Sequence, residues 1–324
     1  MKVLLIDIDG KLPNLALMKI STWHKQQGDD VYLNYCESPE KVYISTLFTW
    51  NKPKVDKLLK MYPNAEIGGT GHDIHKDLPE QIEACKPDYD LYKVNDIYER
   101  IKRGIGKKSS KISKAETIVN AGIGFTSRGC IRQCGFCIVP PKEGKLHSVA
   151  NISDLLNPKS NVLILLDNNI TADPDVIDKL HEIRDRGLVV DITQGIDIRL
   201  LTPEIAQALS EVKHLRSLHY AWDLMSFERP IMDGIKLLSN FLSTRAHKCF
   251  ILVGYNTSFE EDMYRAKKLM EMGVDPYVME YNKILEVKRH CFAGWINGYK
   301  FKVCKFEEYI PWIKVQNDMQ LSLF

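Results

Sequence analysis

The chain has 324 residues, of which 44% are hydrophobic, and its 44 basic and 42 acidic side chains give a net charge of +2. Its length suits two ordinary domains or one barrel-sized domain with an appendage. The balanced charge excludes a global field that would draw the protein onto nucleic acid or membrane. The N-terminus is too acidic for a signal peptide, and no stretch approaches the roughly 18 apolar residues of a membrane span. We therefore expect a cytoplasmic protein whose eight cysteines stay reduced, as ligands or small buried residues.

The first part of the chain alternates between strand and helix patterns. Short apolar runs predict strands at residues 3–8, 31–35, 42–47 and 65–67. Apolar positions at helical spacing predict helices at residues 14–27 and 53–61. This alternation is typical of a small doubly wound α/β domain of the flavodoxin-like (Rossmann-like) kind, which we assign to residues 1–99. Residues 71–122 lose the pattern and contain a basic run from Arg100 to Lys114. We expect an interdomain connection there, partly mobile, with a basic linker at residues 100–122.

From residue 123 the alternation resumes for six units. Strands are predicted at residues 123–127, 161–167, 188–193, 215–223, 248–255 and 275–281, and helices at residues 173–186, 203–212, 228–241 and 260–272. Asp173 with Pro174, and Thr202 with Pro203, are helix-start signals. Six such units predict a partial (β/α)6 barrel over residues 123–282, and ligands of such sheets bind at the C-terminal ends of the strands. The aromatic and basic tail, residues 283–324, is predicted to form a small C-terminal cap.

Three cysteines lie in a predicted loop directly after the first strand of the second domain. Cys130, Cys134 and Cys137 stand at spacings of four and three residues. Three thiolates can hold a [4Fe-4S] cluster and leave one iron open for a small-molecule ligand. A structural zinc site is the alternative, but it needs a fourth ligand such as His147, whose spacing fits no common zinc finger. The motif therefore favours an iron–sulfur cluster.

This segment, with Phe136 just before the third cysteine, resembles the CxxxCxxC signature of the radical S-adenosylmethionine superfamily. The resemblance implies that S-adenosylmethionine chelates the open iron through its amino and carboxylate groups. It also implies that one electron splits the sulfonium into methionine and a 5′-deoxyadenosyl radical. The six βα units match the partial barrel of the superfamily. A flavodoxin or ferredoxin-type partner would deliver the electron, because the sequence shows no reductase module. The substrate stays open, and with it the choice between oxidoreductase and transferase.

Polar residues follow the predicted strands where the resemblance places the cofactor. The candidate cofactor-binding residues are Phe136, Asp167, Asn168, Asn169, Gln194, Asp197, Arg199, Asp223, Gly254 and Asn256. Residues 167–169 replace a Gly-Gly-Glu-like segment that binds the cofactor's amino group in the superfamily, although a polar turn explains them equally well. Arg199 can pair with the cofactor's carboxylate or with Asp197. Asp223 is a candidate acceptor for ribose hydroxyls, and Gly254 lies in a segment similar to the adenine contact of the superfamily.

The first domain carries a second, weaker resemblance. Ser45-Thr46-Leu47 and Gly68-Gly69 resemble the Ser-x-Leu and Gly-Gly elements of cobalamin-binding domains. The motif that supplies a histidine cobalt ligand is absent, and the corresponding loop, residues 9–14, contains no histidine. Phe48 and Trp50 are bulky enough to fill the space. We favour a degenerate domain that does not bind cobalamin, with a cobalamin-dependent methyltransferase as the alternative.

A competing class is a non-catalytic, metal-containing protein that binds nucleic acid through the basic run. That run lacks interleaved aromatic residues for stacking bases, so we expect at most weak, salt-sensitive binding. The scattered thiols Cys36, Cys85 and Cys249 are expected to pack as small buried side chains, although a second cluster stays open.

Overall fold

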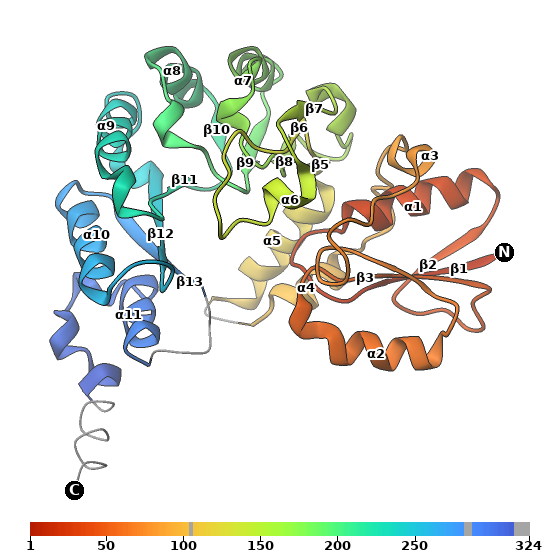
Figure 1. The fold of residues 1–324 in the computed structure, drawn as a ribbon. Helices are drawn as coiled ribbons and strands as arrows, with labels where there is room; N and C mark the ends of the chain where they lie inside the picture. Colours follow the sequence, from red (N-terminus) through yellow and green to blue (C-terminus); the bar gives the residue numbers. More distant parts are fainter. Residues whose placement is uncertain (104–105, 282–286, 314–324) are drawn as a thin grey trace, which may run out of the picture. The chain divides into compact units, whose positions relative to one another are not determined.

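The computed structural model describes residues 1–103, 106–281 and 287–313 and shows a mixed α/β chain built on parallel sheets (Figure 1). The chain divides into two compact units. Unit 1 contains residues 1–129 and 138–166, and unit 2 contains residues 130–137 and everything from residue 167 onward. The cysteine loop, Cys130–Cys137, is therefore grouped with the later part of the chain although unit 1 flanks it in sequence.

Unit 1 is organised around a parallel sheet in the order β2-β1-β3-β4. Its strands are β1 (Lys2–Asp7), β2 (Asp30–Leu33), β3 (Lys41–Ser45) and β4 (Glu66–Gly68), and its first helices are α1 (Leu15–Gln26), α2 (Lys52–Met61), α3 (Glu80–Glu83) and α4 (Val94–Ile101). Figure 1 shows this sheet edge-on between α1 and α2. Successive strand residues point to opposite faces, so Val3 and Leu5 join one buried cluster while Leu4 and Ile6 join another. Two covered faces explain the continuous apolar run in β1.

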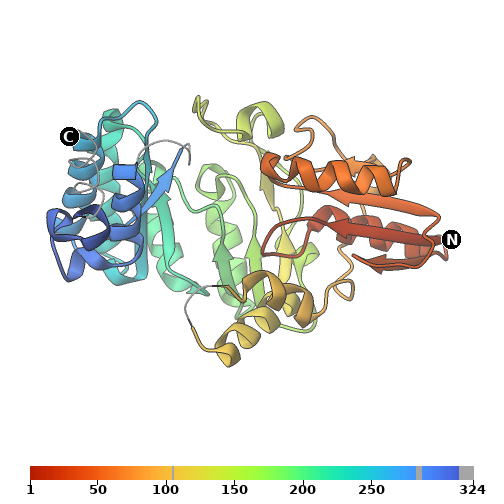
Figure 2. The ribbon, with the colours of Figure 1, turned by 90° about the horizontal axis from the view of Figure 1, so that it is seen from below.

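The rest of unit 1 begins with a helix inside the predicted linker. Its elements are α5 (Lys108–Asn120), β5 (Gly122–Gly124), β6 (Ser127–Arg128), α6 (Val139–Glu143), β7 (His147–Ser148) and β8 (Val162–Leu165). Ala115, Ile118 and Val119 of α5 share one helical face and are buried in the cluster that contains Ile97 of α4, and the two helices lie side by side (Figure 2). The predicted linker therefore contains a regular helix at residues 108–120. The lysines of the basic run had hidden this apolar stripe.

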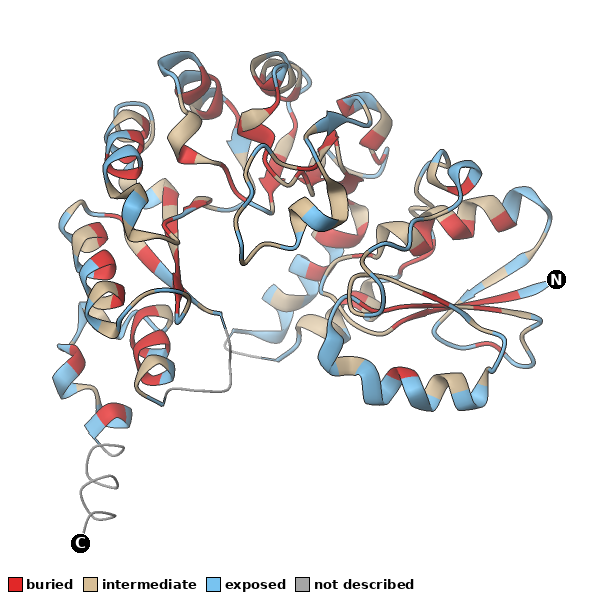
Figure 3. Cartoon of the chain, in the orientation of Figure 1, coloured by how far each residue is buried: buried red, intermediate tan, exposed pale blue. Residues whose placement is uncertain are grey.

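Unit 2 repeats a strand-then-helix pattern. Its strands are β9 (Val189–Ile192), β10 (Lys213–His214), β11 (Leu218–Ala221), β12 (His247–Val253) and β13 (Asp275–Glu280), and its helices are α7 (Val176–Asp185), α8 (Pro203–Glu211), α9 (Glu228–Ser239), α10 (Phe259–Glu271) and α11 (Val287–Asn297). Strands β9 and β10 pair in parallel, and so do β11, β12 and β13. Figure 3 shows the buried residues of its helices on one side of each and the exposed ones on the other.

Helix starts in unit 2 test two sequence predictions. The Thr202 hydroxyl accepts a hydrogen bond from the Ile205 amide at 3.3 Å, which confirms it as the N-cap of α8. The other prediction was wrong, because α7 begins at Val176 and its N-cap is Asp175. Asp173 instead accepts from the Asp175 amide at 2.9 Å and pairs with Lys179 at 2.6 Å, closing the turn before the helix. No helix in the described part of the chain is long and apolar enough to cross a membrane.

Candidate functional site

The cysteine loop carries three half-buried thiols that form no disulfide. The Cys130 sulfur accepts hydrogen bonds from the Arg132 amide at 3.3 Å and from the Asn169 side-chain nitrogen at 3.5 Å. The Cys137 amide donates to the Cys134 carbonyl at 2.9 Å, which closes a tight turn between these two cysteines. Over the residues that the structure describes, no group of three or more His, Cys, Asp or Glu side chains is already gathered to hold a metal ion. The Cys130 and Cys137 thiols lie within electrostatic reach of the Cys134 thiol.

Charges from the strand ends of unit 2 reach the loop. Burial raises the pKa of the Cys134 thiol and the neighbouring Cys137 adds to this, whereas the Arg199 guanidinium opposes it. Burial also raises the pKa of Asp223 to about 6, although Arg265 and Arg199 pull it down. Arg199 follows β9 and Asp223 follows β11. The C-terminal ends of these two strands and Cys134 therefore share one electrostatic environment.

The segment after β9 holds two arginines against one carboxylate. Arg199 forms a fork with Asp197, with Nε to Oδ1 at 2.6 Å and Nη2 to Oδ2 at 2.8 Å. Arg132, from the cysteine loop, adds a bond from its Nε to Asp197 Oδ2 at 2.9 Å. Burial favours the neutral acid, but the hydrogen bonds and charge of Arg199, followed by those of Arg132, hold the pKa of Asp197 below its ordinary value. Arg199 therefore pairs with Asp197, one of the two partners predicted for it.

The turn after β12 has backbone conformations that glycine or asparagine adopts most easily. Gly254 has a φ of +80° and Asn256 a φ of +50°. Between them, the Tyr255 ring meets the Phe136 ring edge-to-face, with centroids 5.1 Å apart. A Cβ on Gly135 would lie 2.9 Å from the Tyr255 hydroxyl oxygen, so the glycine of the cysteine motif permits this contact. The predicted residue Phe136 thus packs against Tyr255, the neighbour in sequence of the predicted residue Gly254.

Other predicted residues have less defined places. Asp167 is fully buried, Asn168 is half-buried, and Gln194 and Asn256 are exposed. The third residue of the Asp-Asn-Asn segment reaches the loop, since the Asn169 side-chain nitrogen donates to the Cys130 sulfur. The position after a strand predicted that these residues would be polar, but it did not predict which of them would reach the loop.

A buried ion-pair network at the ends of β11 and β12 was not predicted from the sequence. The Arg265 guanidinium donates to the carbonyl oxygen of Trp222, just after β11, at 2.5 Å. It also donates to the carbonyl oxygen of Leu252, near the end of β12, at 2.7 Å. Its charge is paired with Asp262 at 2.6 Å, and Arg289 pairs with the same carboxylate at 2.9 Å. Because both side chains of the first pair are fully buried, this network fixes the strand ends that carry Asp223 and Gly254. An arginine at i+3 from an aspartate in a helix is too common a pattern to have signalled it.

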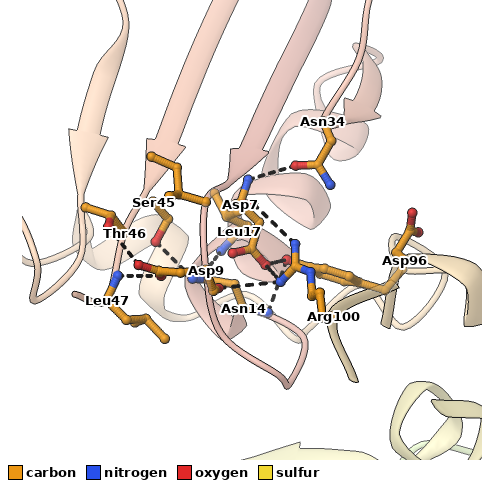
Figure 4. Close-up of polar contacts among 12 residues, drawn as sticks. Asp7, Asp9, Asn14, Leu17, Asn34, Ser45, Thr46, Leu47, Asp96 and Arg100 are labelled. Atoms are coloured by element: carbon orange, nitrogen blue, oxygen red, sulfur yellow. Dashed lines mark hydrogen bonds and ion pairs between the residues drawn. The ribbon is translucent and has the colours of Figure 1, made fainter. Parts of the chain in front are cut away.

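At the C-terminal ends of the unit 1 strands, polar side chains of unit 1 form hydrogen bonds with one another and with the backbone (Figure 4). The Asp9 carboxylate accepts from the Thr46 hydroxyl at 2.9 Å and from the amides of Leu47 at 2.7 Å and Phe48 at 3.1 Å. The buried Asp7 carboxylate accepts from Arg100 at 2.7 Å. These contacts tie the loop after β1 to the loop after β3, at the point where ligands bind in open α/β sheets.

The glycines after β4 bring two loops together rather than opening a space. A Cβ on Gly69 would lie 2.3 Å from the Thr46 carbonyl oxygen, and one on Gly71 would lie 2.5 Å from the Phe48 nitrogen. The Gly71 amide donates to the Thr46 carbonyl at 3.0 Å. Phe48 and Trp50 stack with ring centroids 4.3 Å apart. Gly69 and Gly71 are thus packed against the loop after β3, whereas a Cβ on Gly68 would meet nothing within 4 Å.

Comparison with solved structures finds 11 matching chains. Two of them are Streptococcus suis SuiB bound to S-adenosylmethionine, at 14% identity and a TM-score of 0.40, and SuiB bound to the precursor peptide SuiA, at 12% identity and a TM-score of 0.39. The matches cover 64% and 78% of this chain but only 57% and 60% of the SuiB chains, so this chain spans less than two thirds of their length. No protein-family model and no curated protein matches the sequence. TM-scores this low establish no common fold.

Proposed function

We propose that this chain is a radical S-adenosylmethionine enzyme whose Cys130, Cys134 and Cys137 hold a [4Fe-4S] cluster. The observation that carries the proposal is the contact between the cysteine loop and the segment that follows β8, where Asn169 donates to the Cys130 sulfur. The donor set fits such a cluster, since three free thiols lie on one loop and the Cys130 sulfur receives N–H donors. The chemistry that a cluster supplies there is reductive cleavage of S-adenosylmethionine to methionine and a 5′-deoxyadenosyl radical.

The chain's own residues would orient the cofactor around this loop. Asp223 lies within electrostatic reach of Cys134, so we assign it to the ribose hydroxyls. Gly254 and Tyr255 form the turn after β12 beside Phe136, and we assign that turn to the adenine. Arg199 is held on Asp197, so its charge serves the site mainly by offsetting negative charge around the thiols. The strand walls would shield a radical from water.

The strand-and-helix alternation supports the fold that accompanies this chemistry. We propose that the units from β5 to β13 form a partial (β/α)6 barrel and that residues 1–99 form a flavodoxin-like domain. The order β2-β1-β3-β4 agrees with the first four positions of the flavodoxin-like order 2-1-3-4-5. The domain limits at residues 99, 122 and 282 stay predictions, as do the cytoplasmic location and the flavodoxin or ferredoxin-type electron donor.

The experiment that tests the proposal is anaerobic purification and reconstitution with iron and sulfide, followed by S-adenosylmethionine and a strong reductant. We expect a visible iron–sulfur chromophore and 5′-deoxyadenosine, detected by chromatography and mass spectrometry. The Cys134→Ala variant should yield neither product nor full iron. A protein that binds zinc in place of iron and releases no 5′-deoxyadenosine would favour the non-catalytic, metal-containing class instead.

The contacts at the sheet edge of unit 1 argue against cobalamin binding there. The Asp9 carboxylate is saturated by the loop after β3, and Gly69 and Gly71 lie against the backbone of that loop. A flat macrocycle or its tail would have to displace these contacts. We therefore propose that radical chemistry proceeds here without a corrinoid, and we derive no methyl-transfer step.

A further inference from the structure

Five residues of unit 2 form a closed ring of hydrogen bonds that begins and ends at one cysteine sulfur. Going round the ring, the members are Cys130, Arg132, Asp197, Thr171 and Asn169. We propose that this Cys130 ring positions the cysteine loop before metal binds and tunes the reduction potential of the cluster once it is bound. The inference rests on the proposed function for its second half only.

Each bond of the ring has a defined direction. The Arg132 amide donates to the Cys130 sulfur at 3.3 Å, and the Arg132 Nε donates to the Asp197 carboxylate at 2.9 Å. The Asp197 amide donates to the Thr171 hydroxyl oxygen at 2.8 Å, and Thr171 passes its own proton to the Asn169 carbonyl oxygen at 3.0 Å. The Asn169 side-chain nitrogen then donates to the Cys130 sulfur at 3.5 Å. Both sides of the ring therefore end as donors on the same sulfur.

Burial makes this arrangement specific. Asn169 is 5% exposed and Thr171 is 4% exposed, so water cannot replace a lost partner without cost. Thr171 has one proton to give, and it gives that proton to Asn169, which fixes the amide with its nitrogen facing the sulfur. An aspartate at position 169 would turn a carboxylate toward the thiolate. Asparagine at this position supplies both the acceptor and the donor that the ring needs.

The ring has two separate consequences. The first is mechanical, because the charge-assisted bond from Arg132 to Asp197 ties the loop to the segment after β9 before any metal is present. The second is electronic, because N–H donors on a ligand sulfur withdraw negative charge from it. Such bonds stabilise the reduced form of an iron–sulfur cluster and raise its reduction potential. Arg132, Thr171 and Asn169 are therefore positioning residues that act through Cys130.

The mechanical half is tested on the metal-free protein by amide hydrogen exchange of residues 130–137. Arg132→Gln removes the bond to Asp197, and the loop amides should exchange at least about tenfold faster, since losing a bond to a charged partner costs about 1.5 kcal/mol or more. The matched control is Arg229→Gln, which changes an arginine that is 94% exposed on α9. Loop exchange in Arg132→Gln that equals the control would overturn this half.

The electronic half is tested by an EPR-monitored redox titration of the reconstituted cluster. Thr171→Val removes the hydroxyl that orients Asn169, so the midpoint potential should fall while the iron content stays at the wild-type level. Thr171→Ser keeps the hydroxyl and should retain the wild-type potential. Equal potentials in the valine and serine variants would overturn the tuning. A wild-type protein that takes up no iron and sulfide would instead refute the proposed function and the tuning with it, and the hydrogen-exchange result would still decide whether the ring holds the loop.

Discussion

Removing the Arg265 guanidinium should destabilise unit 2 by about 4 kcal/mol. Arg265 is fully buried and donates to Trp222 O at 2.5 Å, Leu252 O at 2.7 Å and Asp262 Oδ1 at 2.6 Å. Breaking a buried ion pair by removing one partner costs about 3–5 kcal/mol, because the other charge is left uncompensated. Arg289 still pairs with Asp262 at 2.9 Å, which softens that loss, but two buried carbonyls lose their donor as well. We therefore place Arg265→Met near the middle of the range.

The assay is equilibrium urea unfolding of the metal-free protein, followed by far-UV circular dichroism and extrapolated linearly to water. Arg265→Lys keeps the charge but loses the planar fork that reaches several acceptors at once, so it should cost about 2 kcal/mol, roughly half as much. The control is Lys267→Met, an exposed position on the same helix, which should stay within about 0.5 kcal/mol of the wild type. A cost below about 1 kcal/mol for Arg265→Met would show that the guanidinium does not join the ends of β11 and β12.

Three further predictions concern metal, pH and corrinoid. Cys130→Ala should lose the iron–sulfur chromophore, whereas Cys249→Ala, which changes a buried thiol in β12, should keep it; iron and sulfide analysis decides, and chromophore loss in both variants would point to a second cluster. Burial lowers the pKa of His247 to about 4, so the neutral ring contributes stability above pH 6.5 that is lost as the pH falls toward 4, by about 3 kcal/mol in all. Urea unfolding between pH 7 and 4 should show a shallower loss in His247→Gln, and identical slopes would refute the assignment. Protein incubated with hydroxocobalamin and desalted should show no corrinoid absorbance, and one retained equivalent would restore the methyltransferase alternative.

Strand positions could be predicted because their apolar pattern is local. The run in β1 is apolar on both faces, and the structure covers both faces of that strand. The helix α5 was missed because its apolar stripe of Ala115, Ile118 and Val119 is diluted by lysines, so its mean composition indicated a linker. Periodicity at spacings of three and four residues would have found it.

The residues of the candidate site could be predicted only where they stand close together in the sequence at a characteristic spacing. The spacing of the three cysteines, Cys130, Cys134 and Cys137, identifies them as a group. No such spacing marks Arg132 and Thr171, because their partner Asp197 is far away in the sequence. The pairing of Arg199 was equally open, since the predicted partners were Asp197 and the carboxylate of the cofactor. The hydrogen bonds to Asp197 depend on the conformation of the segment after β9. Side-chain contacts between distant segments depend on packing that no local pattern records.

The two sheet edges of this chain lead to opposite conclusions from the same rule. Ligands of open α/β sheets bind at the C-terminal strand ends, and both units place polar residues there. In unit 1 the Asp9 carboxylate accepts hydrogen bonds from the loop after β3. In unit 2 the Cys134 thiol, Asp223 and the turn at Gly254 meet around a loop whose three thiols are in no disulfide. The proposed chemistry is therefore assigned to the edge where soft ligands and ionisable groups lie near one another, and position after a strand is not by itself a sign of function.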